Sequence, residues 1–123
     1  MGDLSPHFST DEFRCKHCGE IIPISPDLLD YLESIREFSG FPIIITSGYR
    51  CPDHNAAVGG APGSAHLTGE AADFAVHSDH ERFRFLEAIF LYGPIRCGVY
   101  PSWIHIDVSR GLPGEVTWVG GID

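Results

Sequence analysis

The stretch SWIHIDV, residues 102–108, decides the architecture that the sequence predicts. Its residues alternate between apolar and polar types, and successive side chains of a β-strand point to opposite faces of a sheet. The isoleucines and the valine therefore belong to a core, while the opposite face presents an imidazole and a carboxylate from His105 and Asp107. Such a pair suits a metal site or an acid–base site. The segment predicts a half-buried strand with chemical groups on its outer face.

Strand and helix signals alternate along the rest of the chain. Serine N-caps and apolar residues at helical spacing predict two long helices, at 26–39 and 79–92. Short β-branched or apolar runs predict further strands at 42–47, 71–76 and 98–100, and the C-terminal tail is expected to hold little regular structure. We therefore expect an α+β fold, with a small, mostly antiparallel sheet that carries the polar face of SWIHIDV on one side and helices on the other.

Size, composition and charge bound the class of protein. A length of 123 residues favours a single domain over 1–123, and 43% hydrophobic with 20% charged residues excludes a largely disordered chain. A formal net charge of −9 repels phosphate backbones and anionic head groups, so no nucleic-acid partner is expected. The apolar stretches are too short for a membrane span, so we expect no membrane insertion, and we expect a monomer.

A second motif, SAHLTGEAADF at 64–74, supplies further metal-binding side chains. His66 lies on a glycine-containing loop, and Asp73 lies in the strand predicted at 71–76. With His105 they form two imidazoles and one carboxylate, the ligand types of a catalytic zinc that keeps a fourth position for water. The chain holds seven histidines, so chance spacings are expected and surface roles stay open on spacing alone.

Three segments in order carry a resemblance to a known family. SGYRCPDHNAAVGG at 47–60, SAHLTGEAAD at 64–73 and GVYPSWIHIDV at 98–108 resemble the M15 peptidases, which are zinc D,D-carboxypeptidases and peptidoglycan endopeptidases with the fold of the hedgehog signalling domain. With HFSTDEF at 7–13, the chain is most similar to the small M15 domains of phage endolysins and bacterial wall-remodelling enzymes. The resemblance covers almost the whole chain.

The resemblance implies a zinc metallopeptidase that cuts peptide bonds of bacterial peptidoglycan by a zinc-activated water, as a lysin-like carboxypeptidase or endopeptidase. It implies that one catalytic Zn²⁺ is bound by His66, Asp73 and His105. Arg50 matches the family arginine that binds substrate and steadies the oxyanion, and hydrogen bonds at the rim would come from Ser47 and Ser64. The first residues lack a signal-peptide pattern, so we expect synthesis in the cytoplasm of a bacterium or a phage-infected cell and action on the wall after release.

The position of the general base departs from the family pattern. Many relatives carry a glutamate three residues before the last zinc histidine, or a histidine two before it; this chain has Ser102 and Trp103 there. Asp107 is the candidate for orienting His105 or for shuttling a proton, and both roles stay open. The departure also leaves open an alternative function, a non-catalytic, zinc-stabilised cell-wall-binding module on the same scaffold.

The four cysteines raise a separate question. CKHC at 15–18 and CPDH at 51–54 have the C-x2-C and C-x2-H spacings of structural zinc sites. The alternatives are a second, closed zinc site, a disulfide clamp and ordinary buried thiols. The residues involved would be Cys15, Cys18, Cys51 and either Cys97 or His54.

Overall fold

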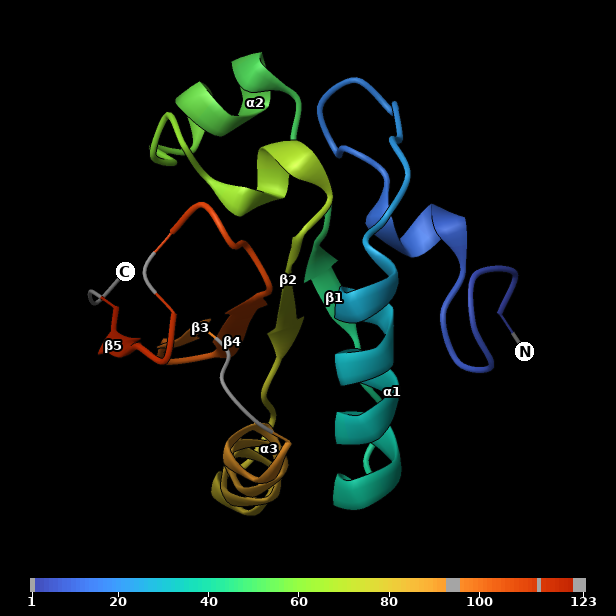
Figure 1. Ribbon diagram of the computed structural model, residues 1–123, viewed down its shortest axis with the longest axis vertical. Coiled ribbons are helices and arrows are strands. Elements are labelled where there is room, and N and C mark those ends of the chain that lie inside the picture. The colour runs from blue at the N-terminus through green and yellow to red at the C-terminus, as the bar shows by residue number, and fades with distance from the viewer. Residues whose placement is uncertain (1, 93–95, 113, 121–123) are drawn as a thin grey trace.

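The computed structural model describes residues 2–92, 96–112 and 114–120, which form an α+β fold (Figure 1). The described strands form one sheet in the order β1-β2-β4-β3-β5, antiparallel except where β3 and β5 run parallel. The strands are β1 (Ile45–Ser47), β2 (Ala71–Ala75), β3 (Arg96–Val99), β4 (Trp103–Asp107) and β5 (Thr117–Val119). The helices are η1 (Thr10–Phe13), α1 (Pro26–Ser39), α2 (Pro52–Ala57), η2 (Ala65–Thr68) and α3 (Asp79–Leu91), η marking 3₁₀ turns.

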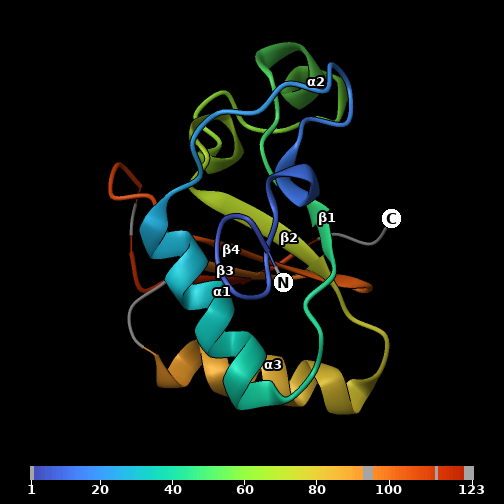
Figure 2. The same ribbon diagram turned by 90° about the vertical axis from the view of Figure 1, so that its right-hand side faces the viewer.

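Helices α1 and α3 pack on one face of the sheet, whereas α2 lies at the opposite end of the molecule from α3 (Figures 1 and 2). The core joins the apolar sides of both helices to alternate residues of the central strands, among them Phe74, Ile104 and Ile106. The intervening residues Asp73 and His105 pair across β2 and β4 and point away from that core. This arrangement confirms the α+β fold with a mostly antiparallel sheet. None of the helices among the described residues is long and apolar enough to cross a membrane.

Local signals place the long helices where the sequence predicts them. The Ser25 hydroxyl accepts a hydrogen bond from the Leu28 N–H at 3.3 Å, and Pro26 occupies the first turn, so α1 spans the expected 26–39. Helix α3 begins at Asp79 after the Ser78 cap and ends at Leu91, one residue before the expected end.

The strands depart further from expectation. β1 covers only Ile45–Ser47 of the predicted 42–47, and its pairing with β2 is irregular between those two residues. β3 begins at Arg96, two residues before the predicted start. The expectation of an irregular tail is wrong at β5, where Thr117–Val119 pairs in parallel with β3. A three-residue parallel edge strand depends on a distant partner, which local patterning does not reveal.

The N-terminal segment is attached to α1 by hydrogen bonds to Glu33. The Glu33 carboxylate accepts from the Ser5 hydroxyl and the His7 N–H, each at 2.7 Å, and lies 2.6 Å from the His7 ring. Burial opposes ionisation of Glu33, but the hydrogen bonds from His7 and Ser5 outweigh it and hold the pKa of its carboxyl below the ordinary 4.5. The ionised carboxylate therefore helps to hold the N-terminal segment on the helix.

Candidate metal centre

The three ligand candidates reach one place from three elements. The Ser64 hydroxyl caps η2 by accepting from the His66 N–H at 3.2 Å. Gly69 then turns the chain into β2 with a φ of 73°, and a Cβ there would lie 2.5 Å from a backbone oxygen. Asp73 of β2 lies directly opposite His105 of β4 in the antiparallel register. The glycine turn thus brings His66 over the pair on the sheet.

The ligand atoms converge closely. His105 Nδ1 lies 2.8 Å from Asp73 Oδ1 and 3.3 Å from His66 Nε2, and His66 Nε2 lies 3.3 Å from the same carboxylate oxygen. His66 is 1% exposed, and the side chains of Asp73 and His105 are 13% and 12% exposed. The three groups are therefore largely removed from water, with only a small opening toward it.

The outer hydrogen bonds of the two imidazoles settle which nitrogen carries the proton. His66 Nδ1 lies 2.7 Å from the Gly48 carbonyl, and His105 Nε2 lies 2.7 Å from the Asp107 carboxylate. Both partners only accept, so these two nitrogens carry the hydrogens in the neutral rings. The nitrogens that face Asp73 are then unprotonated, and their lone pairs point toward one another and toward the carboxylate.

This arrangement fits a bound cation. Two nitrogen lone pairs and a carboxylate oxygen, all within 4.8 Å of one another, repel unless a positive charge lies between them. Neutral imidazoles held by an outer carbonyl and an outer carboxylate, together with one carboxylate ligand, are the donor set and the surroundings of a catalytic zinc. The residues present therefore fit Zn²⁺, with a fourth position left for water or substrate.

The charge on Asp73 is strongly favoured. Burial would raise the pKa of its carboxyl, but when His105 and His66 carry hydrogens on the nitrogens that face Asp73, their hydrogen bonds outweigh burial and hold that pKa well below its usual range. A cation in the place of those hydrogens favours the ionised carboxylate in the same way. Burial likewise raises the pKa of Asp107, and the hydrogen bond from His105 is the main opposing contribution that leaves it below its ordinary value. Both carboxylates are ionised at neutral pH, so the group carries the negative charge that a divalent cation requires.

Arg50 is held at the edge of this group. Its Nη2 lies 3.8 Å from Asp73 Oδ2, and its Nη1 donates to Asn55 Oδ1 at 3.1 Å. Asn55 is 3% exposed and donates in turn to the Ala61 carbonyl at 2.9 Å. A Cβ on Gly60 would lie 2.1 Å from Asn55 Oδ1 and 2.8 Å from Arg50 Nη1. The second glycine of AVGG thus leaves room for the contact that positions the guanidinium.

The remaining predicted residues lie in different surroundings. Ser47 is half-buried in β1 opposite Asp73, and the hydroxyl of Ser64 is used by the cap of η2. Asp107 is 2% exposed; besides His105 it accepts from Arg96 Nε at 3.2 Å and from the Ser109 N–H at 3.2 Å. It contacts the nitrogen of His105 that faces away from Asp73. This position serves to orient the ring.

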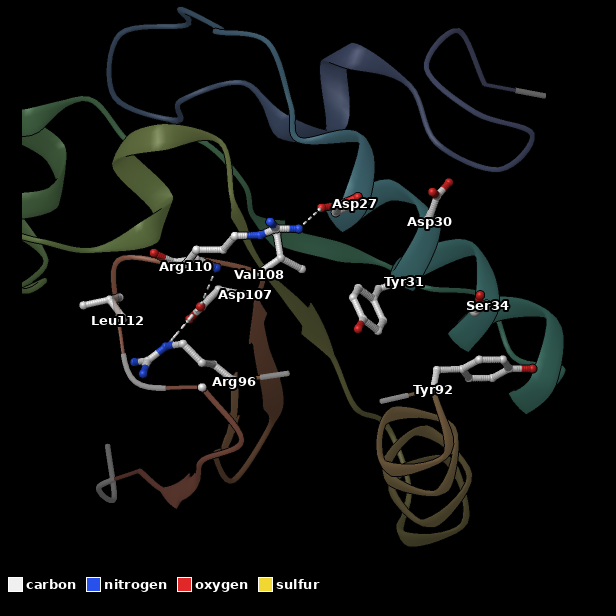
Figure 3. Close-up of a pocket in the computed structure, with 12 residues that line it drawn as sticks. Asp27, Asp30, Tyr31, Ser34, Tyr92, Arg96, Asp107, Val108, Arg110 and Leu112 are labelled. Carbon is white, nitrogen blue, oxygen red and sulfur yellow. Dashed lines mark hydrogen bonds and ion pairs between the residues drawn. The ribbon is translucent and has the colours of Figure 1, made fainter. Parts of the chain in front are cut away.

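A groove of about 680 Å³ lies beside Asp107, between α1 and the segment that follows β4. Figure 3 shows Arg96 reaching Asp107 within it and Arg110 extending toward Asp27 of α1. The three ligand candidates do not line it. Asp107 links the groove to the metal group, because its carboxylate lines the groove and contacts His105.

The cysteines divide into two sets. The sulfurs of Cys15, Cys18 and Cys51 lie within 4.8 Å of one another. Cys97 does not join them, because it is fully buried in the main core on β3, where burial raises the pKa of its thiol to about 11. Burial acts against ionisation of Cys15 too, but backbone N–H groups, that of Cys51 first, lower the pKa of this thiol to about 6. The His54 ring lies outside the three-sulfur group.

Sequence patterns alone miss several supports of the metal group. The Gly48 carbonyl that orients His66 and the buried Asn55 beside Arg50 both lie inside the SGYRCPDHNAAVGG segment. The Trp118 ring, from the unexpected β5, lies 5.5 Å from that of His105, and its Nε1–H donates to the Tyr100 hydroxyl at 3.0 Å. Of these contacts, only the one between Arg50 and Asn55 has a signal in the sequence, which is the glycine pair that follows Asn55.

Comparison with known families gives one clear result. The family model described as Peptidase M15 matches residues 6–107. The matched range includes the three ligand candidates, Arg50 and Asp107. A search of the curated proteins finds no significant match.

Proposed function

The chain belongs to the peptidase M15 family, a family of zinc peptidases, and on that premise we propose that it hydrolyses peptide bonds of bacterial peptidoglycan. The convergence of two inward-facing imidazole lone pairs and the Asp73 carboxylate carries the proposal. The choice of peptidoglycan rests on the likeness of the motifs to small M15 domains of endolysins and wall-remodelling enzymes. Either a D,D-carboxypeptidase or an endopeptidase activity would fit.

The proposed metal and the residue behind His105 have different roles in the reaction. When bound, zinc lowers the pKa of a bound water to about 7 and polarises a carbonyl oxygen. Asp107 acts as a positioning residue that keeps the correct nitrogen of His105 turned toward the metal.

Arg50 is proposed to bind a substrate carboxylate or the oxyanion that develops at the attacked carbonyl. Its Nε is buried and has no hydrogen-bond partner among the described residues, so a donor is available at the edge of the metal group. Burial lowers the pKa of the guanidinium and the charge of Asp73 opposes this; an arginine nevertheless stays charged at neutral pH. A fixed planar cation in this place suits an anionic group.

Digestion of purified peptidoglycan tests the proposal. Wild-type protein should release peptides with new termini, as read by mass spectrometry, and a chelator or His105→Ala should abolish their release. His77→Ala is the matched control, since the His77 side chain is 65% exposed on another segment and should leave activity unchanged. Loss of a terminal D-alanine would identify a carboxypeptidase, and cleaved cross-links an endopeptidase.

The alternative, a wall-binding module that performs no hydrolysis, predicts a different result from the same samples. The protein would co-sediment with peptidoglycan in a zinc-dependent way and release no peptide at any time. That outcome would contradict the proposed hydrolysis while leaving the metal group in place.

A further inference from the structure

A second cluster of metal-ligating side chains lies outside the proposed active site. Cys15 and Cys18 belong to a tight turn in which the Gly19 N–H donates to the Cys15 carbonyl at 2.8 Å and the Cys15 N–H donates to the Glu20 carbonyl at 2.9 Å. Gly19 has a φ of 76°, a left-handed conformation that favours glycine. Cys51 comes from a distant segment, where it caps the first turn of α2. The fold thus brings a C-x2-C turn to a third cysteine.

The backbone around the sulfurs is arranged to stabilise thiolates. The Cys51 N–H donates to Cys15 Sγ at 3.4 Å, and the His54 N–H donates to Cys51 Sγ at 3.4 Å. Thiolates are the form in which cysteine binds metals, and N–H groups directed at sulfur favour that charged form. Two of the three sulfurs therefore receive a donor from the backbone of the segment that carries Cys51.

The number of sulfurs favours a metal over a disulfide. Any disulfide within the group would join two of the three cysteines and leave the third as a thiol, and Cys97 lies elsewhere in the core. A tetrahedral zinc uses all three sulfurs and needs one more ligand to close its coordination. Nothing in this arrangement requires an oxidising compartment.

His54 is the best fourth ligand. It follows Cys51 at C-x2-H spacing, and its own N–H is already bonded to the Cys51 sulfur. Its half-buried ring stacks on the exposed His17 ring, with centroids 5.8 Å apart and planes at 17°. Binding requires the His54 ring to turn toward the sulfurs.

We propose that Cys15, Cys18, Cys51 and His54 form a closed, structural zinc site that is separate from the active site. Its role is to clamp the N-terminal turn onto the segment that follows β1. That segment contains the Gly48 carbonyl, which orients His66, and Arg50 directly before Cys51. The clamp therefore supports both a ligand of the first metal and the proposed substrate-binding arginine.

Metal analysis of the purified chain tests the site independently of hydrolysis. The wild-type protein should contain two zinc ions per chain, and Cys18→Ser, which changes an exposed thiol, should contain one. Cys97→Ala is the control cysteine variant and should keep two. His105→Ala should lose the other ion and keep the cysteine-bound one, so failure of the proposed hydrolysis and failure of this site are distinguishable.

Cobalt substitution reports the ligands directly. Co²⁺ bound by the cysteines should show a thiolate-to-metal charge-transfer band in the near ultraviolet, which His105→Ala keeps and Cys18→Ser weakens. His54→Ala should alter the tetrahedral cobalt spectrum and weaken binding, whereas His17→Ala should not. Three results would each overturn the site: a single zinc in the wild-type chain that His105→Ala removes, an unchanged charge-transfer band in Cys18→Ser, or a protein mass that shows a disulfide. If the cobalt spectrum changed in His17→Ala and not in His54→Ala, the assignment of His54 as the fourth ligand would be overturned.

Discussion

Replacing Asp107 with asparagine separates the orienting role of this residue from its bulk. Asp107 Oδ2 accepts from His105 Nε2 at 2.7 Å and from Arg96 Nε at 3.2 Å, while Oδ1 accepts from the Ser109 N–H at 3.2 Å and lies 3.0 Å from Arg96 Nε. The carboxylate therefore offers only acceptors to partners that all donate. An asparagine of nearly the same shape must direct its NH₂ group at one of these donors.

Both orientations of the amide carry a cost. With the NH₂ group toward His105, the ring must carry its hydrogen on Nδ1, the nitrogen that faces Asp73 and His66, and it can no longer bind the metal in that form. With the NH₂ group toward Arg96 and the Ser109 N–H, donors oppose donors in a site that is 2% exposed. Loss of an outer partner of a metal-binding histidine typically weakens metal affinity or activity about 10- to 100-fold, or about 1.4–2.8 kcal/mol.

Zinc affinity at neutral pH, measured by competition with a chromophoric chelator, gives the readout. We expect Asp107→Asn to bind zinc at the active site about 10- to 100-fold more weakly than wild type and to lose hydrolysis in proportion. Asp27→Asn is the matched control, because Asp27 lines the same groove and pairs with Arg110, whose side chain is 91% exposed. Thermal unfolding in the presence of a chelator checks that both variants fold. If Asp107→Asn bound zinc within about two-fold of wild type, the argument that this carboxylate selects the nitrogen presented to the metal would be refuted.

Two further predictions concern the substrate-binding edge and the N-terminal attachment. Gly60→Ala should displace Arg50 and lower kcat/KM about ten-fold with unchanged zinc content. Gly63→Ala is the control and should match wild type, because the added Cβ would have no atom within 4 Å. Equal loss of activity in both variants would rule out the steric explanation. Glu33→Gln should lower the midpoint of thermal unfolding at neutral pH, and its difference from wild type should shrink as the pH falls below about 4.5. The reason is that the Glu33 carboxyl has a lower pKa in the folded than in the unfolded chain, so its ionised form stabilises the fold above the unfolded pKa. This contribution is lost as the pH falls through the folded pKa and the carboxylate is protonated. Glu37→Gln, on the exposed side of the same helix, should show no such pH dependence, and a constant deficit for Glu33→Gln at every pH would contradict the role of its charge.

Local patterning predicted much of the fold. The Ser25 cap, the following proline and apolar residues at helical spacing define α1 to the residue, and alternation in SWIHIDV places Ile104 in the core and His105 outside it. These features depend on interactions between residues a few positions apart, so the sequence carries them explicitly. The short β1 and the parallel β5 were not predictable in this way, because their pairing depends on strands far along the chain.

The candidate site shows the same division. The residue types of the metal group and the family motifs that carry them can be read from the sequence, since ligand chemistry is a property of the side chains themselves. Which imidazole nitrogen faces the metal depends on the Gly48 carbonyl and the Asp107 carboxylate, and hydrogen bonds to such partners exist only in the folded chain.

The cysteines make the point most simply. Their spacing allowed either Cys97 or His54 beside the other three, because a sequence does not state which distant segments meet. Packing of the folded chain excludes Cys97 from the group, because it buries Cys97 in the main core and brings Cys51 to the Cys15–Cys18 turn. The sequence by itself thus determined the helices, the two-faced strands and the chemical groups, whereas the tertiary structure decided which groups share a site, because that depends on contacts between segments that only the folded core brings together.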